Sequence, residues 1–158
     1  MLPSLAETII NLAQSLLIAV LTAFLTVRLS LRRFRAERWW ERKAEAYSKI
    51  VEALHNAMEY CAAMSDEEQM GSELSDERKK RLTDDYLVAV QEIKKATGIG
   101  AFIISSDVAD VLSKLDARPR PDPNKTAFWE IFDDAFDAYR TALMHIRELA
   151  KKDLEVSN

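Results

Sequence analysis

The stretch TIINLAQSLLIAVLTAFLTV, residues 8–27, decides the fold because it holds twenty consecutive residues without a charged side chain. A helix rises about 1.5 Å per residue, so these residues span roughly 30 Å, the thickness of the hydrocarbon core of a bilayer. Ser4 and Glu7 have the spacing of a capping box, which marks a helix start just before the stretch. The pattern predicts a transmembrane helix. The competing interpretation is a buried helix in the core of a soluble protein.

Basic residues lie on one side of this predicted span only. No Lys or Arg precedes it, whereas seven follow directly: Arg28, Arg32, Arg33, Arg35, Arg38, Arg42 and Lys43. The positive-inside rule places everything after the span in the cytoplasm. A cleavable signal peptide has a basic segment before its apolar part, and none is present, so we expect an uncleaved anchor. The expected topology is a single crossing of the cell membrane, with the N-terminus outside and the C-terminal domain in the cytoplasm.

Small and polar residues recur along one face of the predicted span at steps of three and four. This polar stripe consists of Asn11, Ser15, Ala19, Thr22 and Thr26, with Gln14 beside it. In lipid, small residues let helices approach closely, and Asn or Ser can form hydrogen bonds across the contact. We expect a homo-oligomer that forms through this face. The alternatives are a polar-lined pore and a lone span whose hydroxyls bond to their own backbone.

Residues 29–43, LSLRRFRAERWWERK, contain no Pro or Gly, so the helix is predicted to continue beyond the membrane. Trp39 and Trp40 are candidate interface anchors, or else they begin a core or a subunit contact. The second interpretation is favoured for Trp40, because it opens a 4-3-4-3 apolar series: Trp40, Ala44, Tyr47, Val51, Leu54, Met58 and Cys61. We expect a contact with anionic lipid or a partner through Arg28, Arg32, Arg33, Arg35, Arg38, Trp39 and Trp40.

The remainder of the chain is predicted to be all-α, because three Gly and four Pro leave few turns for a sheet. Helical periodicity predicts three long helices and one short helix, near residues 36–64, 76–97, 107–116 and 126–153. Ser75, and Ser105 or Ser106, are the predicted N-caps. Residues 65–72 are expected to form a polar, mobile loop. Residues 98–106 are apolar and are expected to pack into the core.

These helices are expected to form a small antiparallel bundle, with a coiled coil between chains as the alternative. The predicted domains are therefore an anchor (1–28), a basic and aromatic juxtamembrane helix (29–43) and a cytoplasmic bundle (44–158). The predicted inner face of the helix near 76–97 is Leu82, Tyr86, Ala89 or Val90, and Ile93. That of the short helix near 107–116 is Val108, Val111, Leu112 and Leu115. That of the last helix is Phe128, Phe132, Ala135, Tyr139, Ala142, Ile146 and Leu149.

Charge is distributed unevenly along the chain. Residues 1–43 carry 7 Lys/Arg and 3 Asp/Glu, whereas the remainder carries 15 and 23. An acidic domain lacks the basic face that phosphate neutralisation needs, so no nucleic-acid partner is expected. The acidic residues at the start of the last helix form either a solvated face or a contact for a cation or a basic partner. They are Glu130, Asp133, Asp134 and Asp137.

Residues with catalytic chemistry are few. Glu52 and His55 have the Glu-x-x-His spacing that di-iron bundles use twice, but it occurs once here. Cys61 lies within the apolar series, which favours a small core residue over a nucleophile. The sequence therefore predicts no catalytic residue, no cofactor, no metal and no enzyme activity.

Three stretches carry a resemblance: RWWERKAEAY at residues 38–47, GAFIIS at 100–105 and AKKDL at 150–154. With them, the chain resembles an uncharacterised family of small bacterial inner-membrane proteins that have a single N-terminal span. The resemblance implies a bacterial source and the topology given above. It implies no catalytic residue and no partner.

The leading hypothesis is a membrane-anchored, non-enzymatic helical interaction or scaffold module. Its expected contacts are the lipid bilayer, further copies of the chain and a membrane-protein partner. The competing hypothesis is a membrane-disrupting or pore-forming effector of the toxin or anti-phage type. A bundle enzyme or metalloprotein is a third class.

Overall fold

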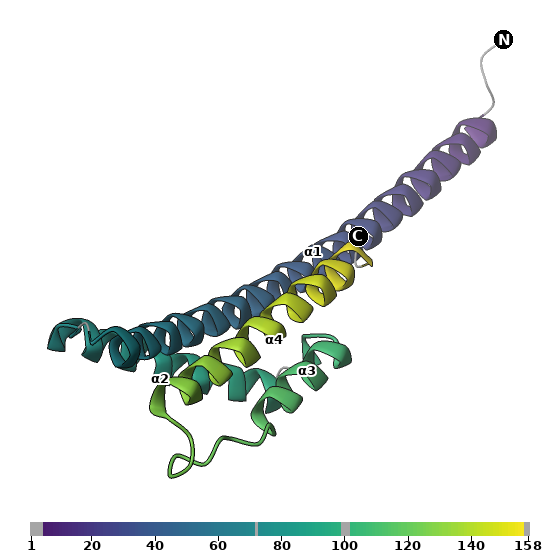
Figure 1. Ribbon diagram of the computed structural model, residues 1–158. Coiled ribbons are helices and arrows are strands. Elements are labelled where there is room, and N and C mark those ends of the chain that lie inside the picture. Colours follow the sequence, from purple (N-terminus) through teal and green to yellow (C-terminus); the bar gives the residue numbers. More distant parts are fainter. Residues whose placement is uncertain (1–4, 72, 99–101, 157–158) are drawn as a thin grey trace. The chain divides into compact units, whose positions relative to one another are not determined.

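The computed structural model describes residues 5–71, 73–98 and 102–156, and it describes side chains within these ranges from residue 14 to residue 155. This part of the chain consists of α1 (Leu5–Met70), α2 (Asp76–Gly98), α3 (Ser106–Asp116) and α4 (Phe128–Val156), without a strand (Figure 1). The prediction of an all-helical chain is confirmed. The chain divides into two compact units, residues 1–41 and 42–158, and α1 contributes to both.

The first unit is the N-terminal part of α1. It contains a helix long and apolar enough to cross a membrane. Every described side chain from residue 14 to residue 41 is exposed, and none in the apolar window is buried by the rest of the chain. The predicted cap at Ser4 lies outside the described residues.

The second unit has a hydrophobic core to which all four helices contribute. Its buried members include Tyr47, Leu54 and Ala57 from α1, Ala89 and Ile93 from α2, Val108 and Leu112 from α3, and Ala142, Leu143, Ile146 and Ala150 from α4. The series predicted for the first helix is confirmed at Tyr47, Leu54 and Cys61, which are all buried. Trp40 does not belong to this cluster, and 38% of its surface is exposed.

The inner face predicted for the last helix needs a correction. Phe128, the first residue of α4, is 59% exposed, whereas Leu143 and Ala150 are buried although the pattern did not include them. Strict 4-3 stepping assumes 3.5 residues per turn. A straight helix has 3.6, so its inner face drifts by about 20° every seven residues. Over the length of α4 this drift moves the core face onto Leu143 and Ala150.

The loop predicted at residues 65–72 is wrong over most of its length, because α1 continues to Met70. The polar side chains here have tertiary partners. The Ser65 hydroxyl is buried and donates to Asp133 Oδ1 at 2.6 Å, and Glu67 accepts from Lys79 Nζ at 2.8 Å. Gly71 then ends the helix with a φ of 62°, which favours glycine, and its N–H donates to the Glu67 carbonyl at 3.0 Å.

The short segment before α3 is less buried than expected. Residues 99–101 lie outside the described part; Ile104 is buried, but Phe102 is 82% exposed. Ser105 occupies the N-cap position of α3 without a side-chain capping bond. Its hydroxyl is buried and has no partner among the described residues. The N-cap predicted for α2 is confirmed, because the Arg78 N–H donates to Ser75 Oγ at 3.4 Å.

Tyr47 connects three helices through its hydroxyl group. It donates to Asp153 Oδ2 of α4 at 2.5 Å and accepts from the Ser105 N–H, at the start of α3, at 2.9 Å. Lys43 Nζ donates to the other carboxylate oxygen of Asp153 at 3.0 Å. Together with Ser65–Asp133, these bonds set α4 alongside the part of α1 after residue 42, in the opposite direction (Figure 1).

Burial is the main cause that raises the pKa of Tyr47, and the adjacent Asp153 carboxylate adds to it. The hydroxyl therefore stays protonated and remains a donor. Partial burial alone would raise the pKa of Asp153, but the hydrogen bonds from Tyr47 and Lys43 and the Lys43 charge outweigh it, so that this pKa is lowered. The carboxylate thus stays charged when the helices pack.

Tyr47→Phe is expected to reduce the free energy of unfolding of the second unit by about 1–3 kcal/mol, because it leaves the Ser105 N–H and one Asp153 oxygen without their partner. Chemical unfolding followed by circular dichroism measures this loss. Tyr60→Phe is the matched control, because it makes the same change at a partly buried tyrosine of α1 whose pKa is raised by burial and by no hydrogen bond. Its expected effect is within about 0.5 kcal/mol. Equal effects of the two substitutions would contradict a bridging role for Tyr47.

Candidate functional site

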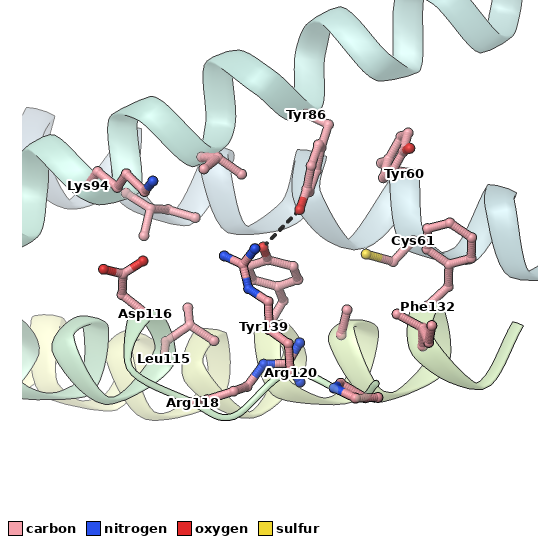
Figure 2. A pocket seen from close by; sticks show the side chains of 15 residues that line it. Tyr60, Cys61, Tyr86, Lys94, Leu115, Asp116, Arg118, Arg120, Phe132 and Tyr139 are labelled. Atoms are coloured by element: carbon pink, nitrogen blue, oxygen red, sulfur yellow. Dashed lines mark hydrogen bonds between the residues drawn. The ribbon is translucent and has the colours of Figure 1, made fainter. Parts of the chain in front are cut away.

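A cavity of about 210 Å³ lies within the second unit, among α1, α2, the end of α3, α4 and the segment that connects α3 to α4. One part of its lining is aromatic, from Tyr60, Tyr86, Phe132 and Tyr139 (Figure 2). The other part is charged and comes from Lys94, Asp116, Arg118 and Arg120. The cavity therefore combines an apolar wall with a mostly cationic rim.

The aromatic wall is held together by contacts between three helices. Tyr60 of α1 stacks on Tyr86 of α2 with ring centroids 4.4 Å apart, and it meets Phe132 of α4 edge-on at 6.0 Å. The hydroxyls of Tyr86 and Tyr139 lie 3.5 Å apart and form a hydrogen bond (Figure 2). Offset stacked and edge-to-face rings are the preferred aromatic geometries, so the wall is a preformed surface.

Three titratable groups that line the cavity, Cys61, Tyr60 and Tyr139, stay neutral at neutral pH. Burial raises the pKa of Cys61 to about 12. Burial, followed by the hydrogen bond with Tyr86, also raises the pKa of Tyr139. Burial raises the pKa of Tyr60 as well. None of these three groups acts as a base near neutral pH, where general acid–base catalysis needs one. They offer hydrogen bonds and apolar contact, which favour the binding of a ligand over its chemical conversion.

The charged rim is positive. Arg118 is held in place because its Nη1 donates to the Asp134 carbonyl at 2.8 Å and to the Asp134 carboxylate at 2.6 Å. Lys94 and Arg120 form no ion pair with any residue that the structure describes. Asp116 is the one carboxylate among the lining residues. The two histidines, His55 and His145, are exposed and lie outside the lining.

The polar stripe is exposed wherever its side chains are described. The Thr22 hydroxyl donates to the Ile18 carbonyl and the Thr26 hydroxyl to the Thr22 carbonyl, each at 2.8 Å. These bonds satisfy both donors within the helix itself. Gln14, Ser15 and Ala19 are also exposed, while the Asn11 side chain lies outside the described residues.

The basic juxtamembrane residues are likewise exposed. Arg33 pairs with Glu37 at 3.0 Å, and the guanidinium of Arg38 lies 5.2 Å from the centre of the Phe34 ring. Trp39 and Trp40 are 47% and 38% exposed. The other arginines predicted for this contact, Arg28, Arg32 and Arg35, lie beside the apolar side chains of Phe24, Val27 and Leu31.

Of the four acidic residues in the first half of α4, three have partners within the chain. Asp133 accepts from Ser65, Asp134 from Arg118, and Asp137 pairs with Arg140 at 3.0 Å. Two of these bonds hold α4 to α1 and to the connector. Among the described residues no group of three or more His, Cys, Asp and Glu side chains is arranged to hold a metal ion.

Sequence reasoning did not predict the cavity. Arg118 and Arg120 belong to the RPRP stretch, which reads as a simple extended connector. Two arginines that alternate with prolines were the available signal, because proline fixes the backbone on which they are carried. Their proximity to Tyr86 and Tyr139 depends on how the helices pack.

Comparison of the chain with protein-family models, curated proteins and solved structures gives no match. Its function is therefore inferred from its own residues.

Cys61 is expected to resist thiol reagents in the folded protein, because it is buried and its pKa is about 12. At neutral pH, labelling of the native chain by iodoacetamide should be about a hundredfold slower, or more, than labelling of the denatured chain. Mass spectrometry of timed samples measures both rates. Rapid labelling of the native chain would contradict a buried, protonated thiol.

Proposed function

We propose that this chain is a single-pass protein of the bacterial inner membrane, whose second unit is a small antiparallel helical bundle that serves as an interaction module in the cytoplasm. The observation that carries the proposal is the uncovered apolar surface of α1. From residue 15 to residue 27 the side chains are apolar or small, and the chain itself buries none of them.

A bilayer is the covering that best fits this surface. The core helix of a soluble protein hides its apolar residues against other helices, whereas this segment has none of its own chain packed on it. Eleven of residues 8–27 are Leu, Ile, Val or Phe, and each favours insertion by roughly 0.3–0.6 kcal/mol near the membrane centre. Soluble monomers rarely leave an apolar surface of this length in water.

The arginines support one orientation. Arg28 and Arg32 lie next to the apolar side chains of Phe24 and Leu31. Such long side chains can cover apolar surface with their methylene groups while the charge reaches the headgroups. Since all the early basic residues follow the span, the positive-inside rule favours a cytoplasmic second unit.

In this proposal the polar stripe is a contact between copies of the chain. Ala19 and the small residues around it permit close approach, and a membrane tether raises the effective concentration of the bundle for neighbours in the same bilayer. A water-filled pore is less favoured, because the Thr22 and Thr26 hydroxyls already donate to their own helix. Close packing between copies of the helix does not require these two hydroxyls to donate any other hydrogen bond.

Membrane insertion is tested by Leu17→Arg, which places a charge near the middle of the span. An arginine there disfavours insertion by about 2.5–3.5 kcal/mol, so most of the variant should leave the membrane fraction, whereas the control Leu17→Ala should stay. Carbonate-washed membranes are compared by immunoblot. In parallel, a C-terminal fluorescent protein should fluoresce and a C-terminal alkaline phosphatase should be inactive. Wild-type chain in the soluble fraction, or an active phosphatase, would overturn the proposal.

Self-association is tested by oxidative cross-linking in membranes. Ala19→Cys, on the polar stripe, should give disulfide-linked dimers, whereas Leu21→Cys, on the opposite face, should give few. Cys61 is buried and contributes little background. Non-reducing gels measure the dimer fraction. The absence of dimers with Ala19→Cys, or equal dimers from both variants, would argue against association through the stripe.

A further inference from the structure

We propose that the cavity of the second unit is a binding site for a small aromatic anion, a single ring that carries a carboxylate or a phosphate group. The proposal concerns residues 60–139 alone, so it does not depend on the membrane anchor. It is argued from the size of the cavity, its aromatic wall and the charges on its rim.

The volume limits the ligand to about one ring. The cavity measures about 210 Å³. An engineered cavity of about 150 Å³ is sufficient for benzene, whereas sites for drug-sized ligands begin near 300 Å³. A benzene ring with one small substituent therefore fits, and a nucleotide does not.

The wall selects an aromatic ligand. Tyr60, Tyr86 and Phe132 already contact one another by stacking and edge-on packing, so their faces and edges are fixed before a ligand enters. The hydroxyls of Tyr86 and Tyr139 lie at the same surface and supply hydrogen bonds to a polar substituent (Figure 2). A preformed wall of this kind binds a flat ring with little loss of side-chain freedom.

The rim selects a negative charge. The lining holds three basic side chains, Lys94, Arg118 and Arg120, and one carboxylate, Asp116, although the chain after residue 43 carries 23 acidic and only 15 basic residues. Arg118 is largely neutralised by Asp134, which leaves Lys94 and Arg120 without ion pairs among the described residues. They come from two different elements, α2 and the connector, and meet at one cavity. In the view of Figure 2, Lys94 and Asp116 lie at one end, and Tyr60, Cys61 and Phe132 lie at the other.

The test uses the full chain in nanodiscs of phosphatidylcholine, which carries no net charge. The probes are benzoate and phenyl phosphate, with benzyl alcohol as the neutral control, and empty nanodiscs correct for partition into lipid. Ligand-observed NMR and calorimetry should show saturable binding of at least one anion, with a Kd on the order of 0.1–1 mM for a ligand of this size. Benzyl alcohol should bind at least about threefold more weakly. Binding of both anions indicates recognition of charge alone, and binding of one identifies the preferred group.

Charge variants test the rim in both directions. Lys94→Gln with Arg120→Gln should weaken binding about three- to tenfold, as expected for the loss of two exposed charge contacts. Asp116→Asn should tighten it. Lys80→Gln with Arg81→Gln, also exposed on the chain but outside the lining, is the matched control and should leave binding within about twofold.

A cavity-filling variant tests the location. Ala135→Met projects a longer side chain into the cavity and should abolish binding, whereas Ala138→Met, on the same helix but outside the lining, should retain it. Thermal unfolding confirms that each variant is folded. The proposal is overturned if neither anion binds, if benzyl alcohol binds equally well, or if binding to folded Ala135→Met or to the rim variant is unchanged.

Discussion

The buried hydroxyl of Tyr47 is the point on which the packing of the second unit depends. It donates to a carboxylate of α4 and accepts from the backbone N–H of Ser105, the N-cap residue of α3, so a single side chain of α1 sets the position of two other helices. A buried donor or acceptor without a partner is destabilising, and here each of the three groups satisfies another. The Lys43 ammonium completes the arrangement, because it compensates the partly buried charge of Asp153.

A second polar contact acts at the other end of the same helix pair. Ser65 is a buried polar residue of the core, and its bond to Asp133 joins the last turns of α1 to the first turns of α4. The apolar surface between these two ends supplies most of the driving force, but it is not directional. The polar bonds fix how far α4 is shifted along α1. That shift sets which residues of α4 face the connector, including Tyr139 and Asp134.

The cavity follows from the same packing. Arg118 is fixed to Asp134 of α4, and this bond holds the proline-rich connector against α4, at the cavity that Tyr60 and Tyr86 also line. The Cys61 thiol and the Tyr139 hydroxyl at the cavity are neutral, so they offer contact and hydrogen bonds in place of a base. The two proposals therefore concern separate parts of the chain. One rests on apolar surface that the chain leaves uncovered, and the other on a cavity that the packed helices and the connector line.

The sequence by itself determined the features that arise from local periodicity and composition. These are the all-helical class, the apolar stretch at residues 8–27, the cap at Ser75 and the buried positions Tyr47, Leu54, Cys61, Ala142 and Ile146. Helix geometry relates each of these residues to neighbours three or four positions away, so the pattern is readable without a structure. Only the tertiary structure decided that α1 continues through residues 65–70, that Leu143 and Ala150 replace Phe128 in the core, and that Arg118 and Arg120 meet the tyrosines. The first and the last depend on a partner more than ten residues away, Asp133 for Ser65 and Asp134 for Arg118, and the position of such a partner is set only when the helices pack. The second depends on the drift of the inner face along α4, which a strict 4-3 pattern leaves out.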